Sequence, residues 1–189
     1  RLTMTGSDAL EYPATLPGEL AKAGFHTQAV GKMHHSPQRR LYGFHHMVLD
    51  ESGRREGDFI SDYHEWFDEN KDGPYGYRDH SVDWNSWMAR PSHLPEHLHP
   101  SRWTASEGIK FLKHRDPTKP FFMWLSFARP HSPYDAPQTY FDMYKDNPDI
   151  PRAAVGDWCD RWDKKVADFE HHAANLQNTL AAVSYTHLT

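Results

Sequence analysis

Two side chains that could handle an anion stand two positions apart in the stretch from Gly31 to His34, which reads Gly-Lys-Met-His. Gly31 permits a tight turn, and the side chains of Lys32 and His34 point the same way if the segment stays extended. A lysine ammonium suits an oxygen of phosphate or sulfate, and an imidazole can transfer a proton near neutral pH. Alone, the pattern is also typical of a surface loop with solvated charges, so it needs a second signal.

The second signal is His131, which stands between two prolines in the stretch from Arg129 to Tyr134. Proline restricts the backbone, and a positioned catalytic histidine needs a stiff support. Two alternatives remain open. The segment could be a proline-rich turn that carries an incidental histidine, and Arg129 could be structural rather than a partner for an anion.

Adjacent histidines, His34-His35 and His45-His46, raise the question of a metal site. Neither pair has the His-x3-His spacing of a helical zinc site, no cysteine accompanies them, and neighbours on a strand point to opposite faces. The sequence therefore predicts no metal ligands in this chain.

Aromatic and polar residues between positions 79 and 103 offer other binding chemistry. The tryptophans there favour a packing role, although a sugar-stacking platform would use the same side chains. These tryptophans are Trp84, Trp87 and Trp103, and the residues that could contact a polar substrate are Asp79, His80 and Asp83.

Lys32 is preceded by an expected helix and strand. Thr15 can cap a helix that Gly24 ends. Residues 25–30 are β-prone and read as a buried strand that runs directly into Gly31 and Lys32.

The same order occurs again before His131. Thr104 and Glu107 form a capping-box pattern for a helix that reaches His114. Residues 121–127 are continuously apolar, which predicts a strand covered on both faces. In open α/β sheets, ligand sites lie at the carboxyl ends of strands, and both Lys32 and His131 stand at such positions.

The remaining chain is less regular. Residues 43–102 are interpreted as an irregular, aromatic-rich insertion with one helix expected over residues 58–69. Further helices are expected over residues 139–145 and 163–183.

Composition limits the class of protein. The 189 residues, 38% of them hydrophobic, suffice for one domain with a core. Acidic residues outnumber Lys and Arg by 26 to 21, which argues against a nucleic-acid partner, and no apolar run is long enough to span a membrane. The single cysteine, Cys159, excludes a disulfide within the chain. No signal peptide is visible at Arg1, and the localisation stays open.

Several motifs together resemble the sulfatase family. The stretch from Thr15 to His34 is similar to the family's helix, its strand and its Gly-Lys-Trp/Met-His motif. Residues 42–44 resemble the Gly-Phe motif that follows. Residues 119–122 and the stretch from Arg129 to Tyr134 resemble its Pro-Phe-Phe strand and its Pro-His-x-Pro loop. These landmarks fall in family order and cover most of the chain from Thr15 to Asp157.

The resemblance implies an α/β fold, in particular part of an alkaline-phosphatase-like sandwich. Residues 1–189 would form a partial N-terminal catalytic domain of a sulfuric ester hydrolase that uses a formylglycine nucleophile beside a calcium ion. By the same resemblance, Lys32 would stabilise the sulfate and the formylglycine hydroxyls. His34 would help remove a proton when sulfate is expelled, and His131 would bind sulfate and act as an acid toward the leaving-group oxygen.

Parts of the family pattern are not found in this sequence. The segment Cys/Ser-x-Pro-x-Arg that supplies the nucleophile is expected upstream, and the calcium ligands and a second active-site lysine are expected outside the chain. Cys159 has no Pro-x-Arg after it and is not the nucleophile. The residues 184–189 depart from the family, and the chain alone is expected to be inactive.

The substrate expected from the resemblance is a sulfate ester of a small molecule or a carbohydrate, with no nucleic-acid or membrane partner. Many relatives are exported, which would place the protein in the periplasm or outside the cell. Two rival functions stay open: a phosphodiesterase or phosphonate hydrolase of the same superfamily, and a non-catalytic glycan-binding module built on the tryptophan-rich insertion.

Overall fold

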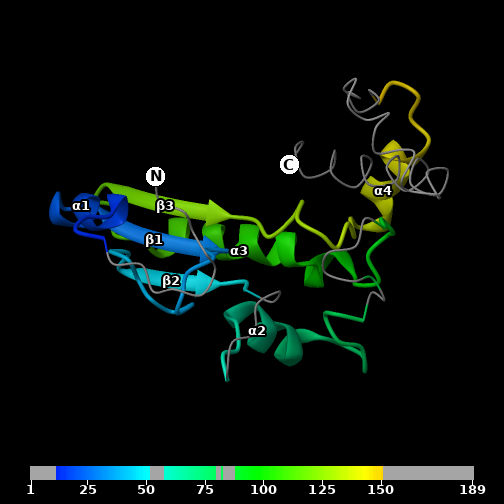
Figure 1. The fold of residues 1–189 in the computed structure, drawn as a ribbon, viewed down its shortest axis with the longest axis horizontal. Helices are drawn as coiled ribbons and strands as arrows, with labels where there is room; N and C mark the ends of the chain where they lie inside the picture. The colour runs from blue at the N-terminus through cyan, green and yellow to red at the C-terminus, as the bar shows by residue number, and fades with distance from the viewer. Residues whose placement is uncertain (1–11, 52–57, 80–81, 83–87, 151–189) are drawn as a thin grey trace, which may run out of the picture. The chain divides into compact units, whose positions relative to one another are not determined.

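The computed structural model describes residues 12–51, 58–79, 82 and 88–150. Figure 1 shows the elements in chain order. They are α1 (Leu16–Lys22), β1 (His26–Gly31), β2 (His46–Leu49), α2 (Asp62–Asn70), the short 3-10 helix η1 (Glu96–Leu98), α3 (Pro100–His114), β3 (Phe121–Ser126) and α4 (Gln138–Lys145). The expected helix over residues 163–183 lies outside the described residues, as do Cys159, Trp84, Trp87, His80 and Asp83.

The chain divides into two compact units. The first comprises the described residues up to Tyr77 and those from His97 to Ala128. It contains all three strands. The second comprises the described residues from Arg78 to Glu96 and those from Arg129 onward, and it contains α4.

The helix before β1 forms as predicted. Thr15 is the N-cap of α1, and its hydroxyl oxygen accepts from the Gly18 amide at 3.2 Å. Glu19 in the first turn stabilises the positive end of the helix. The chain leaves α1 through Gly24, whose φ of +91° is a conformation that favours glycine.

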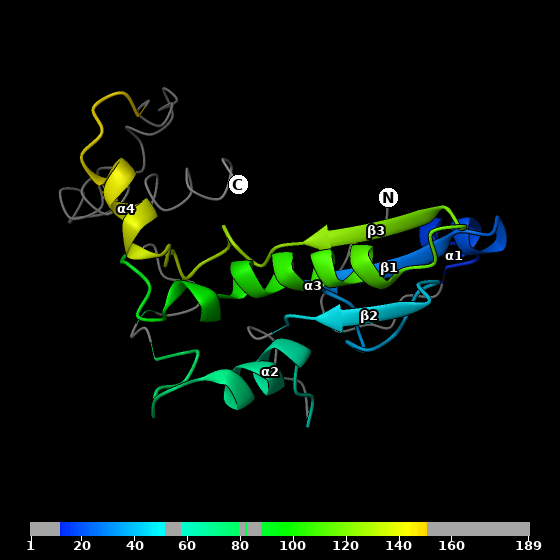
Figure 2. The same cartoon turned by 180° about the vertical axis from the view of Figure 1, so that it is seen from behind.

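A three-stranded parallel sheet forms the centre of the first unit, with the order β2-β1-β3. The fold class α/β is therefore confirmed for this part of the chain. Ala29 and Val30 of the central strand are fully buried. Figures 1 and 2 show the three arrows running in one direction, with α3 lying along the sheet.

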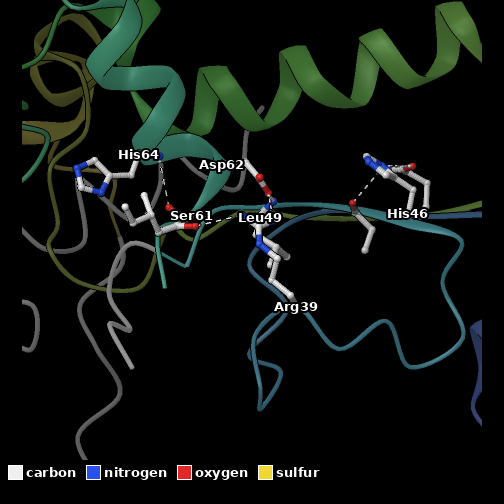
Figure 3. A network of polar contacts seen from close by, with 9 residues as sticks. Arg39, His46, Leu49, Ser61, Asp62 and His64 are labelled. Carbon is white, nitrogen blue, oxygen red and sulfur yellow. Dashed lines mark hydrogen bonds and ion pairs between the residues drawn. The ribbon is translucent and has the colours of Figure 1, made fainter. Parts of the chain in front are cut away.

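The strand β2 was not predicted, and it lies inside the expected insertion of residues 43–102. Its four residues are too short a run to show a period, and long-range pairing decides the structure: Val48 pairs with Val30 of β1. A side chain of the next helix also fixes its end, because Asp62 Oδ2 accepts from the Leu49 amide at 2.6 Å (Figure 3). Ser61 caps α2, so the helix expected over residues 58–69 is confirmed with a later start.

The strand β3 is less buried than its sequence predicts. Within the described residues it is the outer strand, next to β1 alone, and Trp124 is 51% exposed. One face contacts α3, where a Cβ placed on Gly108 would come within 2.9 Å of Leu125 Cδ1. The prediction of burial on both faces is wrong for the described part of the chain, since Phe121 and Trp124 of this strand are exposed there.

The start of α3 also differs from the prediction. The helix begins at Pro100, and its N-cap is His99, which accepts from the Ser101 amide at 3.2 Å. Thr104 lies inside the helix and is fully buried, so the predicted capping box at Thr104 is wrong. Proline at the first helical position and a capping histidine together start the helix earlier.

Aromatic packing of α2 against α3 completes the first unit. The rings of Tyr63 and Trp103 lie 5.4 Å apart, and the hydroxyl of Tyr63 donates to the Leu98 carbonyl at 2.9 Å. Trp103 is 2% exposed. Its expected role as a packing residue is therefore confirmed.

In the second unit, a short backbone ladder supports the chain around Tyr134. The Arg90 amide donates to the Tyr134 carbonyl at 3.0 Å, and the Ser92 amide donates to the Ala136 carbonyl at 2.8 Å. The short helix expected over residues 139–145 is confirmed as α4, whose Phe141 packs with Ala136. None of the helices in the described ranges is long and apolar enough to cross a lipid bilayer.

Candidate active site

Gly31 makes the turn that carries the chain from β1 into Lys32. Its φ is +93°, and a Cβ at this position would lie 1.9 Å from the Ser126 carbonyl oxygen of β3. The Lys32 amide donates to that same oxygen at 2.9 Å. Glycine is therefore required here for two reasons, the left-handed backbone and the close approach of β3.

The neighbouring strand β2 fixes the other side of this turn. Directly after β2, the Asp50 amide donates to the Gly31 carbonyl at 3.1 Å. The next residue, Glu51, is 2% exposed, and its Oε1 accepts from the amides of Met33 at 2.7 Å and His34 at 2.5 Å. The segment from Gly31 to His34 is thus bonded to the carboxyl ends of both adjacent strands.

The backbone changes direction at His34. Its φ is +58°, which is uncommon for a residue other than glycine. The segment is therefore not extended through His34, and alternation along a strand does not apply to Lys32 and His34. Lys32 is half-buried and His34 is exposed. Both residues belong to one short turn of the first unit, as their spacing predicts.

The other histidines of this region have local partners. His35 Nδ1 lies 2.9 Å from the Arg40 carbonyl oxygen, and its ring contacts Tyr42 edge to face at 4.7 Å. His46 Nδ1 lies 3.1 Å from the Gln28 side-chain amide nitrogen. In the part of the chain that the structure describes, no three His, Cys, Asp or Glu side chains form a group that could hold a metal ion.

His131 belongs to the second unit, in a loop that a buried ion pair closes. Arg129 Nε and Nη2 donate to Asp135 Oδ1 and Oδ2 at 2.5 and 2.9 Å. Both side chains are buried. Of the two interpretations of Arg129, this ion pair supports the structural one. A bidentate pair of this kind fixes orientation as well as distance.

The hydrogen bond of His131 identifies which ring nitrogen carries a proton. Nδ1 lies 2.9 Å from the Ser132 carbonyl oxygen. A carbonyl oxygen only accepts, so Nδ1 must donate. In the neutral ring, Nε2 is then the basic nitrogen, and the exposed ring leaves it available to a bound molecule.

Two carboxylates at these turns were missed from the sequence. Glu51 follows β2, and since that strand was not predicted, the end where Glu51 lies could not be recognised. Asp135 stands six residues after Arg129, a spacing that is common by chance and gives no signal without the loop geometry. The predicted residues Lys32 and His34 share one turn, while His131 lies in the other unit.

An ion pair also joins Arg39 to Asp62 in the first turn of α2. Arg39 Nη1 donates to Asp62 Oδ2 at 2.9 Å (Figure 3), and this hydrogen bond raises the pKa of Arg39 above its ordinary value. The arginine is half-exposed, so the ion pair contributes little to stability.

The sequence of the chain is similar to a family of known proteins. A family model described as Sulfatase matches residues 2–187. An "Arylsulfatase" from Clostridium perfringens is 44% identical over 165 residues, which are 82% of this chain and 34% of that protein. A "Sulfatase" from Formosa agariphila is 31% identical over 68% of this chain and 24% of its own length. The mouse "Arylsulfatase J" is 27% identical over 70% of this chain and 21% of its own length. The chain thus spans about a third or less of the length of these relatives.

Proposed function

The chain belongs to the sulfatase family, and on that premise we propose that the complete protein hydrolyses a sulfate ester. Lys32, His34 and His131 would be the active-site residues that this chain contributes. The observation that carries the proposal is the turn at Gly31. It presents Lys32 at the carboxyl ends of adjacent parallel strands, bonded to Ser126 of β3. This end of a parallel sheet is where ligands bind in α/β proteins.

Lys32 would bind the sulfate group. An ammonium placed by a fixed backbone stabilises negative charge on sulfate oxygens as that charge grows toward the transition state. The half-buried position of Lys32 reduces competition from water. His34 would accept a proton, since its backbone is fixed and its ring is exposed.

His131 would act on the leaving group. With Nδ1 donating to Ser132, a doubly protonated ring would carry its second proton on Nε2 and would give it to the leaving-group oxygen as a general acid. The ion pair between Arg129 and Asp135 would keep the loop in place during this transfer.

The formylglycine and calcium that the resemblance implies are not assigned to any described residue. No described cluster of acidic or histidine side chains suits a metal ion, so calcium ligands would come from other parts of the complete protein.

By the same premise, the three-stranded sheet would be part of an alkaline-phosphatase-like sandwich. Residues 1–189 would belong to a catalytic domain, with residues 43–102 as an insertion that also supplies the strand β2. The substrate class would be a sulfate ester of a small molecule or a carbohydrate. An aryl ester is the natural first probe, because two of the relatives carry the name arylsulfatase.

The proposal is tested by measuring the turnover of 4-nitrophenyl sulfate and of 4-nitrophenyl phosphate by the complete protein and its Lys32→Ala variant. We expect the sulfate to be preferred and the variant to lose about 100- to 1,000-fold in kcat, the usual loss when one stabilising group is removed. Lys113→Ala is the matched control, since Lys113 is exposed in the last turn of α3.

Wild-type turnover in the Lys32→Ala variant would overturn the site. A preference for the phosphate ester would instead favour a phosphoryl-transfer enzyme. Binding of sulfated glycans by a protein that turns over neither ester would favour a binding module.

A further inference from the structure

The carboxylate of Glu51 lies beneath the turn that carries Lys32 and His34. It is 2% exposed, and one oxygen, Oε1, accepts from two successive backbone amides, those of Met33 and His34. Both contacts run to the backbone of the turn. Glu51 thus contacts the turn without using the side chains of Lys32 or His34 in these bonds.

A buried carboxylate at this position has to be explained. Burying an ionised carboxylate is costly unless hydrogen bonds compensate, and bonds to an ionised acceptor are about twice as strong as neutral ones. A merely structural contact between β2 and the turn could be made by an uncharged side chain. At Glu51, by contrast, one carboxylate oxygen accepts two amides at the same point.

The backbone conformation of His34 explains why a strong hydrogen-bond acceptor is needed at this point. A left-handed conformation costs a non-glycine residue roughly 1–2 kcal/mol, and it persists only where surrounding groups enforce it. The His34 amide, at the residue with φ of +58°, is one of the two donors to Glu51. One hydrogen bond therefore joins His34, whose backbone is strained, to the buried carboxylate of Glu51.

We propose that Glu51 is a positioning residue that fixes the left-handed turn at His34, and so sets where the Lys32 ammonium and the His34 imidazole meet the substrate. This inference rests on the proposed function, because it concerns the same site. In this role Glu51 acts through the two backbone amides from which it accepts. A displacement of about 1 Å in a group of this kind can cost a hundredfold in rate.

The test compares Glu51→Gln and Glu51→Ala in the complete protein, with 4-nitrophenyl sulfate as the substrate. Glutamine keeps the volume and one acceptor oxygen but loses the charge, whereas alanine removes the acceptor. We expect kcat to fall about tenfold in Glu51→Gln and about 100-fold in Glu51→Ala, while KM changes much less. This ordered loss, with partial rescue by the conservative variant, is not expected of a residue that only stabilises the fold.

Asp62→Asn is the matched control. Asp62 is also a carboxylate that accepts a backbone amide near the end of β2, that of Leu49 at 2.6 Å, but it belongs to α2 and this bond runs to β2 rather than to the turn. We expect this variant to lower the unfolding temperature and to leave kcat within about twofold of wild type, because it weakens β2 without altering the turn.

The outcomes separate this inference from the proposed function. If Lys32→Ala abolishes turnover while Glu51→Ala keeps the wild-type kcat, the role of Glu51 is overturned and the proposed function stands. If Lys32→Ala is fully active, the proposed site fails, and if the wild-type protein turns over no sulfate ester, the proposed function fails. Should Glu51→Ala not fold, Glu51→Gln decides alone: a wild-type kcat overturns the proposal. A Glu51→Gln protein that does not fold also overturns it, since Glu51 would then serve the sheet as a whole.

Discussion

At the residue scale, Gly31 combines a positive φ with a close backbone contact, whereas Gly24 has the positive φ alone. Gly24 has a similar positive φ, but a Cβ there would have no atom within 4 Å. At Gly31 a Cβ would collide with the Ser126 carbonyl oxygen. Comparing the two positions therefore separates the conformational cost from the steric one.

We expect Gly24→Ala to lower the free energy of unfolding by about 1 kcal/mol, the cost of a left-handed alanine. Gly31→Ala should lower it by about 3 kcal/mol or more, because overpacking is added to the same conformational cost. Urea unfolding of the complete protein measures both. Equal losses at the two positions would contradict the close approach of β3 to β1.

At the scale of elements, the loop from Arg129 to Asp135 depends on one buried ion pair. We expect Asp135→Asn to lower the free energy of unfolding by about 3–5 kcal/mol, since it leaves the buried Arg129 without its charge partner. Thermal or urea unfolding of the complete protein measures the loss.

Glu19→Gln serves as the comparison for that ion pair. Glu19 contacts Lys22 on the surface of α1, where an exposed pair contributes about 0–1 kcal/mol. If the two substitutions cost the same, the pair at Arg129 is not buried in solution.

The helices and strands that the sequence predicted correctly are those that depend on interactions between residues close together in the chain. The caps at Thr15 and Gly24 are side-chain and backbone preferences within a few residues, so α1 and the strand after it were found. The strand β2 and the start of α3 were not, because a four-residue strand shows no period and His99 is an unusual cap.

The candidate site was predicted in the same partial way. Lys32, His34 and His131 have residue types and spacings that stand out, whereas Glu51 and Asp135 became visible only through their partners. A residue that acts by contacting another segment gives no recognisable pattern in the sequence around it.

At the scale of the whole molecule, the exposed strand β3 can be compared with the length of the relatives. The arylsulfatase relative is about three times as long as the matched region. Trp124 is 51% exposed on the outer strand, yet the sequence of this strand is continuously apolar. We expect residues outside this chain to cover Trp124 in the complete protein.

Thiol labelling tests this expectation. In the complete protein, the Trp124→Cys variant should react about tenfold or more slowly with a soluble thiol reagent than the Lys113→Cys variant, since labelling of a covered site requires local opening. Lys113 lies exposed on α3, so it reports free access. Equal labelling rates would show that this part of the sheet stays open to solvent.

The hydrogen bond from the Lys32 amide to Ser126 has a consequence for the order of folding. On a ribosome, the segment from Thr15 to Gly43 emerges early and can close on itself, since the Thr15 hydroxyl donates to the nearby Tyr42 carbonyl. The carbonyl that receives the Lys32 amide belongs to a strand synthesised much later, and closing so long a loop costs entropy before any contact is gained. Lys32 therefore has no fixed position at the stage when α1 and β1 have already been synthesised. The turn that carries it forms fully only when β3 docks, so an unfinished chain does not yet hold Lys32 in place.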